Sequence, residues 1–220
     1  WYGSGRAKGQ LLNCFVVPTG DSREGWAKAV SDMLIISGTG GGVGMNFSPI
    51  RPRGTPIRGT GGEATGAVSL MEVINQTGEV IKESLQDAFP NLPFADLENL
   101  TELFSADNET IYKNLIKHEL DMRLKNANVS VLVDDEFFEM VKADKNIDFI
   151  WRNKEVGSIP AREIWDMIVL NSYTSGEPGI LNEGLANEMN NIWYHKPLIS
   201  TNPCGEIWLE EYGCCDLGSI

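Results

Sequence analysis

The run Asn202-Pro203-Cys204-Gly205-Glu206 places an amide, a thiol and a carboxylate close together in the chain. A cysteine sulfur can hold an unpaired electron, and the thiyl radical exchanges hydrogen with a carbon next to oxygen once a cofactor has started the chemistry. If the run is extended, Cys204 and Glu206 point the same way, so the carboxylate can take a hydroxyl proton while the thiyl takes the hydrogen. Asn202 lies on the same face and can orient that hydroxyl without titrating. The run therefore predicts radical chemistry on a polyol.

A plain turn is the alternative interpretation of the same five residues. In that case Pro203 and Gly205 only punctuate the chain, and Cys204 packs as a small hydrophobic residue. The pentapeptide alone leaves both interpretations open.

The other cysteines are Cys14, Cys214 and Cys215. In an intracellular chain of this size, cysteines are more often reduced, catalytic or metal-bound than held in structural disulfides. Their spacing contains no C-x-x-C pair, and the two histidines do not fall at zinc-finger spacing, so no metal site is expected.

Composition limits the class of protein. The 220 residues fit one domain or a large piece of one, and 42% apolar residues is ordinary for a globular core. A net charge of −13 argues against a general nucleic-acid surface, which needs clustered Lys and Arg. No apolar stretch reaches the roughly 18 residues that span a bilayer, so a cytoplasmic protein is expected. The missing initial Met and the abrupt end favour a partial chain.

Strands and helices are expected to alternate along the chain. This order is typical of an α/β sheet with largely parallel strands. Asp21 and Glu24 resemble a capping box, which marks the start of a helix. The expected strands lie at 10–17, 45–47, 129–133 and 180–182, with a hairpin over 147–156, and the expected helices at 21–37, 67–82, 108–120, 135–143, 160–172 and 183–191.

A dense glycine segment, residues 38–44, follows the first expected helix. Glycines allow backbone to approach a ligand closely, so Gly40 to Gly44 can line a nucleotide site. They are also common in ordinary turns, and the pattern alone does not separate the two interpretations.

Taken together, these motifs resemble the large-subunit core of class I and class II ribonucleotide reductases. The resemblance runs from Arg6 to Gly218 apart from one internal stretch. Pro203 and Gly205, together with the run Tyr212-Gly213-Cys214-Cys215-Asp216-Leu217, are most similar to the adenosylcobalamin-dependent class II enzymes. The resemblance implies that residues 1–220 form part of a ten-stranded α/β barrel, in which a finger loop carries a thiyl cysteine into the centre.

The resemblance also implies roles for the thiols and their neighbours. Cys204 is the thiyl residue, Glu206 the general base at the substrate 3′-hydroxyl, and Asn202 its hydrogen-bonding companion. Cys14 and Cys215 are the pair that reduces the 2′ position and ends as a disulfide. Because these two lie 201 positions apart, a closed sheet is expected to bring them together. Cys214 is the weaker candidate, since the family's second redox cysteine precedes a Leu by two positions.

Binding roles are implied in the same way. Gly41 and Gly42 match positions that line the substrate pocket, and Asp21, Arg51 and Arg58 match residues that bind a deoxynucleotide or ATP effector. The alternative is that Asp21 only caps its helix and the arginines are solvated, although Asp21 can do both. A thioredoxin-type reductant and a second copy of the chain are the implied partners.

One segment departs from the family pattern. Residues 83–122 contain no glycine and no arginine, although the family has a loop rich in both that relays effector identity to the substrate site. The specificity loop therefore looks replaced. Two alternatives to a class II enzyme stay open: a class I large subunit that receives its radical from a separate metal-containing subunit, and a catalytically inactive nucleotide-binding module.

Overall fold

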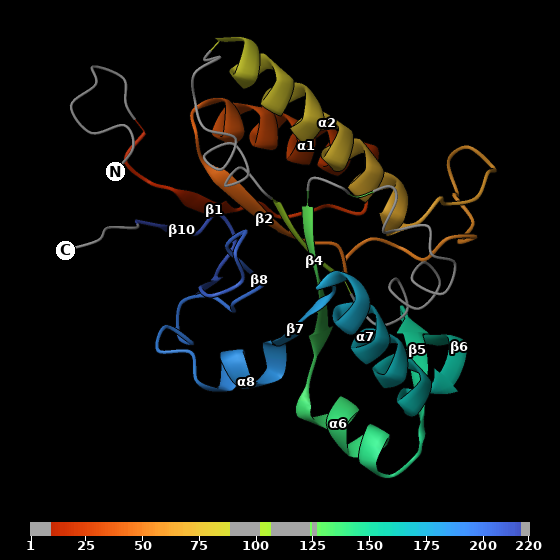
Figure 1. Cartoon of the computed structure of the whole chain (residues 1–220). Helices are drawn as coiled ribbons and strands as arrows, with labels where there is room; N and C mark the ends of the chain where they lie inside the picture. Colours follow the sequence, from red (N-terminus) through yellow and green to blue (C-terminus); the bar gives the residue numbers. More distant parts are fainter. Residues whose placement is uncertain (1–9, 89–101, 107–123, 125–126, 217–220) are drawn as a thin grey trace.

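The protein is built on an open, six-stranded sheet in the order β10-β1-β2-β3-β4-β7 (Figure 1). This computed structural model describes residues 10–88, 102–106, 124 and 127–216, with the backbone alone for 83–88 and 102–106. Within this sheet, β1, β2, β3, β4 and β7 run parallel, and β10 is antiparallel to β1. They are β1 (Cys14–Val16), β2 (Gly42–Asn46), β3 (Glu102–Ala106), β4 (Ala127–Val133), β7 (Gly179–Asn182) and β10 (Cys214–Cys215).

Helices α1 (Arg23–Gly38) and α2 (Ala67–Ala88) lie side by side against one face of the sheet (Figure 1). The other helices among the described residues and two small hairpins follow β4 in the chain. They are α6 (Asp135–Lys142), α7 (Ala161–Ser175) and α8 (Glu183–Glu188), with β5 (Asn146–Trp151) paired to β6 (Lys154–Pro160), and β8 (Ser200–Thr201) paired to β9 (Trp208–Leu209).

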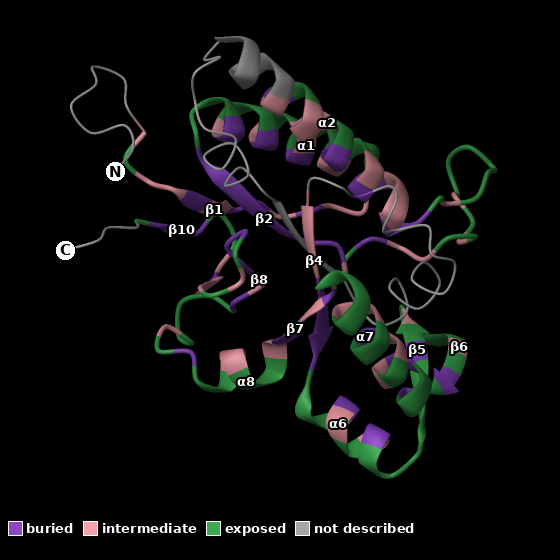
Figure 2. Ribbon diagram, in the orientation of Figure 1, coloured by how far each residue is buried: buried purple, intermediate pink, exposed green. Residues whose placement is uncertain are grey.

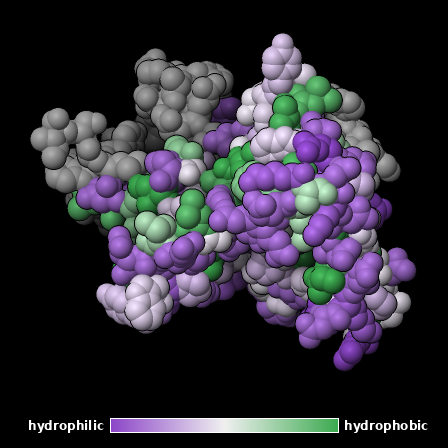
Figure 3. Space-filling model, turned by 90° about the horizontal axis from the view of Figure 1, so that it is seen from below, coloured by the Kyte–Doolittle hydropathy of each residue, from purple (hydrophilic) through white to green (hydrophobic). Residues whose placement is uncertain are grey.

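All residues of strand β2 are buried (Figure 2), but its two faces pack against different parts of the protein. Because side chains alternate along a strand, Val43 and Met45 share one face, where they join the core formed with Met33 of α1 and Leu70 of α2. The opposite face carries Gly42, Gly44 and Asn46. Away from this core, the surface viewed from below is mostly hydrophilic, with small apolar patches (Figure 3).

The glycines of β2 make room for a segment that runs from the last residue of β8 to the residue before β9. We call this segment the finger loop (residues 201–207). A Cβ built at Gly44 would lie 1.8 Å from the Thr201 carbonyl oxygen, and one at Gly42 would lie 2.6 Å from Cγ of Pro203. Further along the same face, the Asn46 amide donates to the Ile199 carbonyl at 2.8 Å. The expectation of a glycine loop up to residue 44 is therefore wrong, because Gly42 to Gly44 form a strand.

Several other expected elements are confirmed. The hairpin turns at Arg152 and Asn153, and α7 begins directly after Pro160, both as expected. The parallel α/β sheet is also confirmed. The expected helix at 108–120 lies outside the described residues.

Three expectations are corrected. The cap of α1 is Ser22, whose hydroxyl accepts from the Gly25 amide at 2.9 Å, so Asp21 does not cap the helix. Strand β3 lies within residues 83–122, where no strand was expected. Among the described residues the sheet is open, so a ten-stranded barrel is not confirmed, and closure is not what joins Cys14 to Cys215. Antiparallel pairing of β10 with β1 does this directly.

The contact at Gly44 generates a stability prediction. We expect Gly44→Ala to lower the free energy of unfolding by about 3 kcal/mol or more, because its methyl group must displace the finger-loop backbone. Urea denaturation measures the effect. Gly38→Ala is the matched control, since a Cβ there meets nothing within 4 Å and alanine is the better helix former, so its stability should stay within about 1 kcal/mol. Equal midpoints for both variants would contradict the proposed contact.

Candidate active site

The finger loop is a tight turn organised by Asn202. The Asn202 backbone N–H donates to the Ile207 carbonyl at 3.0 Å, and the Asn202 side-chain oxygen accepts from the Ile207 backbone N–H at 3.0 Å. The Gly205 N–H donates to the Asn202 carbonyl at 3.0 Å, with Gly205 in the left-handed region at φ 87°. The run is therefore not extended, and its geometry comes from a turn that only glycine adopts without strain at that position.

Asn202 also joins the finger loop to the first strand of the sheet. It is completely buried, and its amide nitrogen lies 3.8 Å from the Cys14 sulfur, to which it donates. On the neighbouring part of the same sheet face, the Asn128 amide contacts the Pro203 carbonyl at 3.4 Å. Asn202 thus positions two of the predicted catalytic thiols relative to each other, a role that its residue type alone did not indicate.

Cys204 lies at the tip of the turn with its side chain exposed, and Glu206 is exposed beside it. Partial burial raises the pKa of the Cys204 thiol, and the negative charge of Glu206 and the nearby Cys14 raise it further. The thiol therefore stays protonated at neutral pH and keeps a hydrogen atom to give. The turn brings this thiol and carboxylate together even though the run is not extended.

Cys14 and Cys215 face each other directly across the β1–β10 pair. Both are free thiols and buried, at 6% and 8% exposure. Burial, followed by donation of its hydrogen to Cys215, raises the pKa of the Cys14 thiol to about 12. Burial also raises the pKa of Cys215, although the hydrogen bond from Cys14 partly offsets this. Directly opposed residues on antiparallel strands have the Cα separation that a disulfide needs.

Cys214 is exposed, because neighbouring residues of a strand point to opposite faces. The turn before it is fastened to α1. Lys28 lies 4.8 Å from the centre of the Tyr212 ring, and the Tyr212 hydroxyl contacts Asp32 at 3.4 Å. This anchor holds the short β10 strand against β1, with Cys215 rather than Cys214 facing Cys14.

The two predicted substrate-site glycines have different surroundings. Gly42 lies directly beneath Pro203, one residue from Cys204, and so borders the thiol site. A Cβ at Gly41 would instead lie 2.8 Å from side-chain atoms of Phe15 and Ile36. Close packing accounts for both glycines, and their role in a substrate pocket stays a prediction.

The predicted effector residues divide into a pair and an outlier. Arg51 Nε donates to both carboxylate oxygens of Asp21, at 2.8 and 3.0 Å, and the Arg51 backbone N–H donates to the same carboxylate at 3.1 Å. Arg58 is exposed on the loop that follows. Arg152, which the sequence pattern did not single out, approaches Asp21 from the β5–β6 hairpin, with its Nη2 3.6 Å from the carboxylate.

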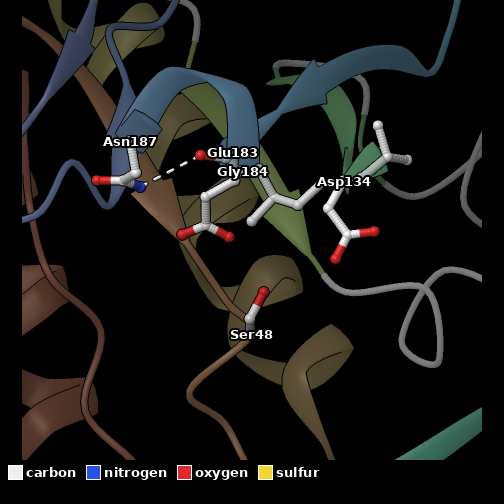
Figure 4. A pocket seen from close by; sticks show the side chains of 7 residues that line it. Ser48, Asp134, Glu183, Gly184 and Asn187 are labelled. Carbon is white, nitrogen blue, oxygen red and sulfur yellow. Dashed lines mark hydrogen bonds between the residues drawn. The ribbon is translucent and has the colours of Figure 1, made fainter. Parts of the chain in front are cut away.

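A pocket of about 390 Å³ opens at the carboxyl ends of β2, β4 and β7 (Figure 4). Ser48, Asp134, Glu183 and Asn187 contribute polar groups to its wall. Burial and the nearby Asp134 raise the pKa of Glu183. Asp134 follows the end of β4, whereas Asn128, which contacts the finger loop, lies near its start. No sequence motif marked the pocket, because its lining comes from three distant segments.

Within the described part of the chain, no three His, Cys, Asp or Glu side chains come together as metal ligands. No helix among these residues has the length and apolar content to cross a membrane.

The family model described as "Ribonucleotide reductase, barrel domain" matches residues 12–220. The vitamin B12-dependent ribonucleoside-diphosphate reductase of Thermoplasma acidophilum is 34% identical over 99% of this chain and 28% of its own length. The protein of the same name from Mycobacterium tuberculosis is 29% identical over 99% of this chain and 30% of its own length. The chain therefore spans less than a third of these curated relatives.

A triphosphate enzyme shows a weaker similarity. The adenosylcobalamin-dependent ribonucleoside-triphosphate reductase of Levilactobacillus brevis is 25% identical over 91% of this chain and 27% of its own length.

The opposed thiols predict a specific disulfide. We expect mild oxidation of the folded chain with diamide to join Cys14 to Cys215, because their Cα atoms are directly opposed. Peptide mapping under non-reducing conditions identifies the pair. Cys214→Ser is the control and should leave the same disulfide. A bond that uses Cys204 or Cys214 in the unmodified chain would contradict the arrangement.

The buried Cys14 thiol predicts a loss of stability in alkali. Its pKa rises from the ordinary 9.0 to about 12 on folding, so between these values the unfolded chain has released a proton that the folded chain keeps. Ionisation then favours unfolding, and the free energy of unfolding should fall as the pH rises above 9. Denaturant titrations at several pH values measure the slope. We expect a shallower slope for Cys14→Ser; identical slopes would exclude this thiol as the cause.

Proposed function

The chain belongs to the ribonucleotide reductase barrel-domain family, and from this premise we propose that it carries the thiol site of a class II ribonucleotide reductase. The reaction converts ribonucleotides to 2′-deoxyribonucleotides, and residues 1–220 are part of one catalytic barrel domain. The observation that carries the proposal is the convergence of three free thiols. Cys14 and Cys215 are opposed and buried, and Asn202 links Cys14 to the loop that presents Cys204.

In the proposed reaction, the Cys204 thiyl takes the hydrogen atom from the 3′ carbon while Glu206 accepts the proton of the 3′-hydroxyl. Asn202 holds that hydroxyl with the amide hydrogen that its contact with Cys14 leaves over. The 2′-hydroxyl leaves as water after taking up a proton. Cys14 and Cys215 provide two electrons and two hydrogens and become a disulfide; one hydrogen leaves as the proton on the 2′-hydroxyl and the other goes to the 2′ carbon. Cys204 then returns its hydrogen to the 3′ carbon, and Glu206 returns its proton to the 3′ oxygen.

The proposed cofactor is adenosylcobalamin, which when bound supplies the radical that removes the hydrogen atom from a thiol. Cys204 suits such a partner because its side chain is exposed, whereas Cys14 and Cys215 are buried. The loop tip is also open, since a Cβ at Gly205 would meet only Leu181, at 4.0 Å. Cys204 and Gly205 are therefore the residues of this chain that would face the cofactor. The names of the Thermoplasma and Mycobacterium relatives support this choice.

Regulation and partners belong to the same proposal. Asp21, Arg51 and Arg58 bind the deoxynucleotide or ATP effector, and Gly41 and Gly42 line the substrate pocket. A thioredoxin-type protein reduces the disulfide after each turnover, and the enzyme is a cytoplasmic homodimer. The substrate is a ribonucleoside di- or triphosphate, as the relatives' names cover both. The unusual 83–122 segment takes the place of the family's specificity loop.

Two alternatives predict different requirements. A class I large subunit would need a separate metal-containing radical subunit and no cobalamin. One relative has a name without cobalamin: the ribonucleoside-diphosphate reductase large chain of Schizosaccharomyces pombe, which is 24% identical over 100% of this chain and 30% of its own length. An inactive nucleotide-binding module would have no need for two buried cysteines opposed across a strand pair, so the thiol geometry favours an enzyme.

Turnover tests the proposal. Anaerobic incubation of the protein with CDP or CTP, adenosylcobalamin and dithiothreitol should yield the deoxynucleotide, detected by chromatography. Cys204→Ala should reduce the product below detection, because no other exposed thiol lies on the finger loop. Cys214→Ala is the matched control and should retain product, since dithiothreitol reduces the Cys14–Cys215 disulfide directly. Product that forms without cobalamin, or that survives Cys204→Ala, would refute the class II mechanism.

A further inference from the structure

The β5–β6 hairpin turns on an unusual residue. Arg152 and Asn153 form its two-residue turn, with φ of 49° and 62°. Both positions are left-handed, a conformation that favours Asn and Gly in such turns and that a long side chain rarely adopts. The local backbone therefore gives no reason for arginine at residue 152.

The guanidinium of Arg152 reaches toward a carboxylate that already has partners. Its Nη2 lies 3.6 Å from Asp21, and the side chain is 69% exposed. The Asp21 carboxylate accepts three hydrogen bonds from Arg51, two from Nε and one from the backbone N–H, and Arg51 Nη2 donates to the Asp21 backbone carbonyl at 3.1 Å. A separation of 3.6 Å is too long for a strong hydrogen bond, and the guanidinium carbon lies 5.7 Å from the centre of the Trp151 ring, so Arg152 is held only by weak contacts.

Two guanidinium groups thus face one carboxylate. The excess positive charge is local, in a chain whose formal net charge is −13. Planar guanidinium groups match phosphate oxygens in pairs, and the positive excess favours a ligand with several negative charges. The carboxylate beside them can accept a hydroxyl group, so the chemistry fits a phosphorylated sugar.

We propose that Arg152 is a phosphate-binding residue of the site formed by Asp21 and Arg51, which rests on the effector role proposed above. When a deoxynucleoside triphosphate binds, Arg152 leaves Asp21 and contacts phosphate oxygens. The Asp21 oxygen that Arg152 approached, Oδ2, still accepts from Arg51 Nε and can then also accept from the sugar hydroxyl. The exchange breaks only a loose, exposed contact, and it recruits the β5–β6 hairpin to the effector site.

Substitution at the turn separates binding from folding. Arg152→Asn removes the guanidinium and introduces a residue that suits the left-handed turn, so the variant should be at least as stable as the original in thermal unfolding. Arg152→Lys keeps the charge without the planar fork. Lys154→Gln removes an exposed positive charge two positions away and serves as the control for general electrostatics.

Isothermal titration calorimetry with each of the four deoxynucleoside triphosphates measures the effect. For the nucleotide that binds most tightly, we expect Arg152→Asn to raise Kd about tenfold, Arg152→Lys by an intermediate factor, and Lys154→Gln less than twofold. Inorganic tripolyphosphate should lose affinity for Arg152→Asn by a similar factor, since the contact is to phosphate. The salt dependence of binding should also become weaker.

The contrary outcomes are distinct. Binding that Arg51→Gln weakens but Arg152→Asn leaves unchanged overturns this inference and keeps the effector site. An equal loss with Lys154→Gln also overturns it, because the effect would then be general charge. If none of the four nucleotides binds to the unmodified protein, the effector role of Asp21 and Arg51 fails together with that of Arg152.

Discussion

The thiol site depends on how closely the finger loop can approach strand β2. At Gly44 the Thr201 carbonyl occupies the place where a Cβ would be, and at Gly42 the ring of Pro203 does the same. No other residue type permits this approach, since any side chain would push the loop away from the sheet. The other face of β2 is anchored by Val43 and Met45 in the main core, so the strand itself cannot retreat. The loop position is therefore fixed from both sides of the sheet.

The polar contacts then set the orientation of the loop. Asn202 closes the turn with its backbone and side-chain oxygen, and its remaining amide group points to Cys14. Asn128 holds the loop at Pro203, and Asn46 holds the chain just before the loop at Ile199. Amides suit this work because they donate and accept without carrying charge, which a buried location would disfavour. The proposed radical cysteine is thus exposed on a loop that hydrogen bonds hold in place, while the proposed redox pair stays buried.

Local signals in the sequence predicted local features well. The helix expected from residue 160 and the strand expected at 129–133 are both present, because both depend on neighbours in the chain. The β2 glycines were taken for a loop, since the residues that require them to be small, Thr201 and Pro203, lie about 160 positions away in the chain. The contact between Arg152 and Asp21 was not predicted for the same reason, because the two residues are distant in the chain and meet only in the folded structure. Ser22 and Asp21 are both suitable cap residues, but Ser22 caps α1 and the Asp21 carboxylate accepts from Arg51 instead.

The antiparallel placement of β10 beside β1 has a topological consequence. A bond between residues 14 and 215 would turn most of the described chain into a covalent ring of about 200 residues. In the chain-entropy account, closing so large a loop removes about 5 kcal/mol of freedom from the unfolded state. Each catalytic cycle would therefore alternate the domain between a linear and a circular polymer, with the circular form harder to unfold. The resistance of the protein to heat or proteolysis would then increase with the fraction of molecules in which the disulfide has formed and has not yet been reduced.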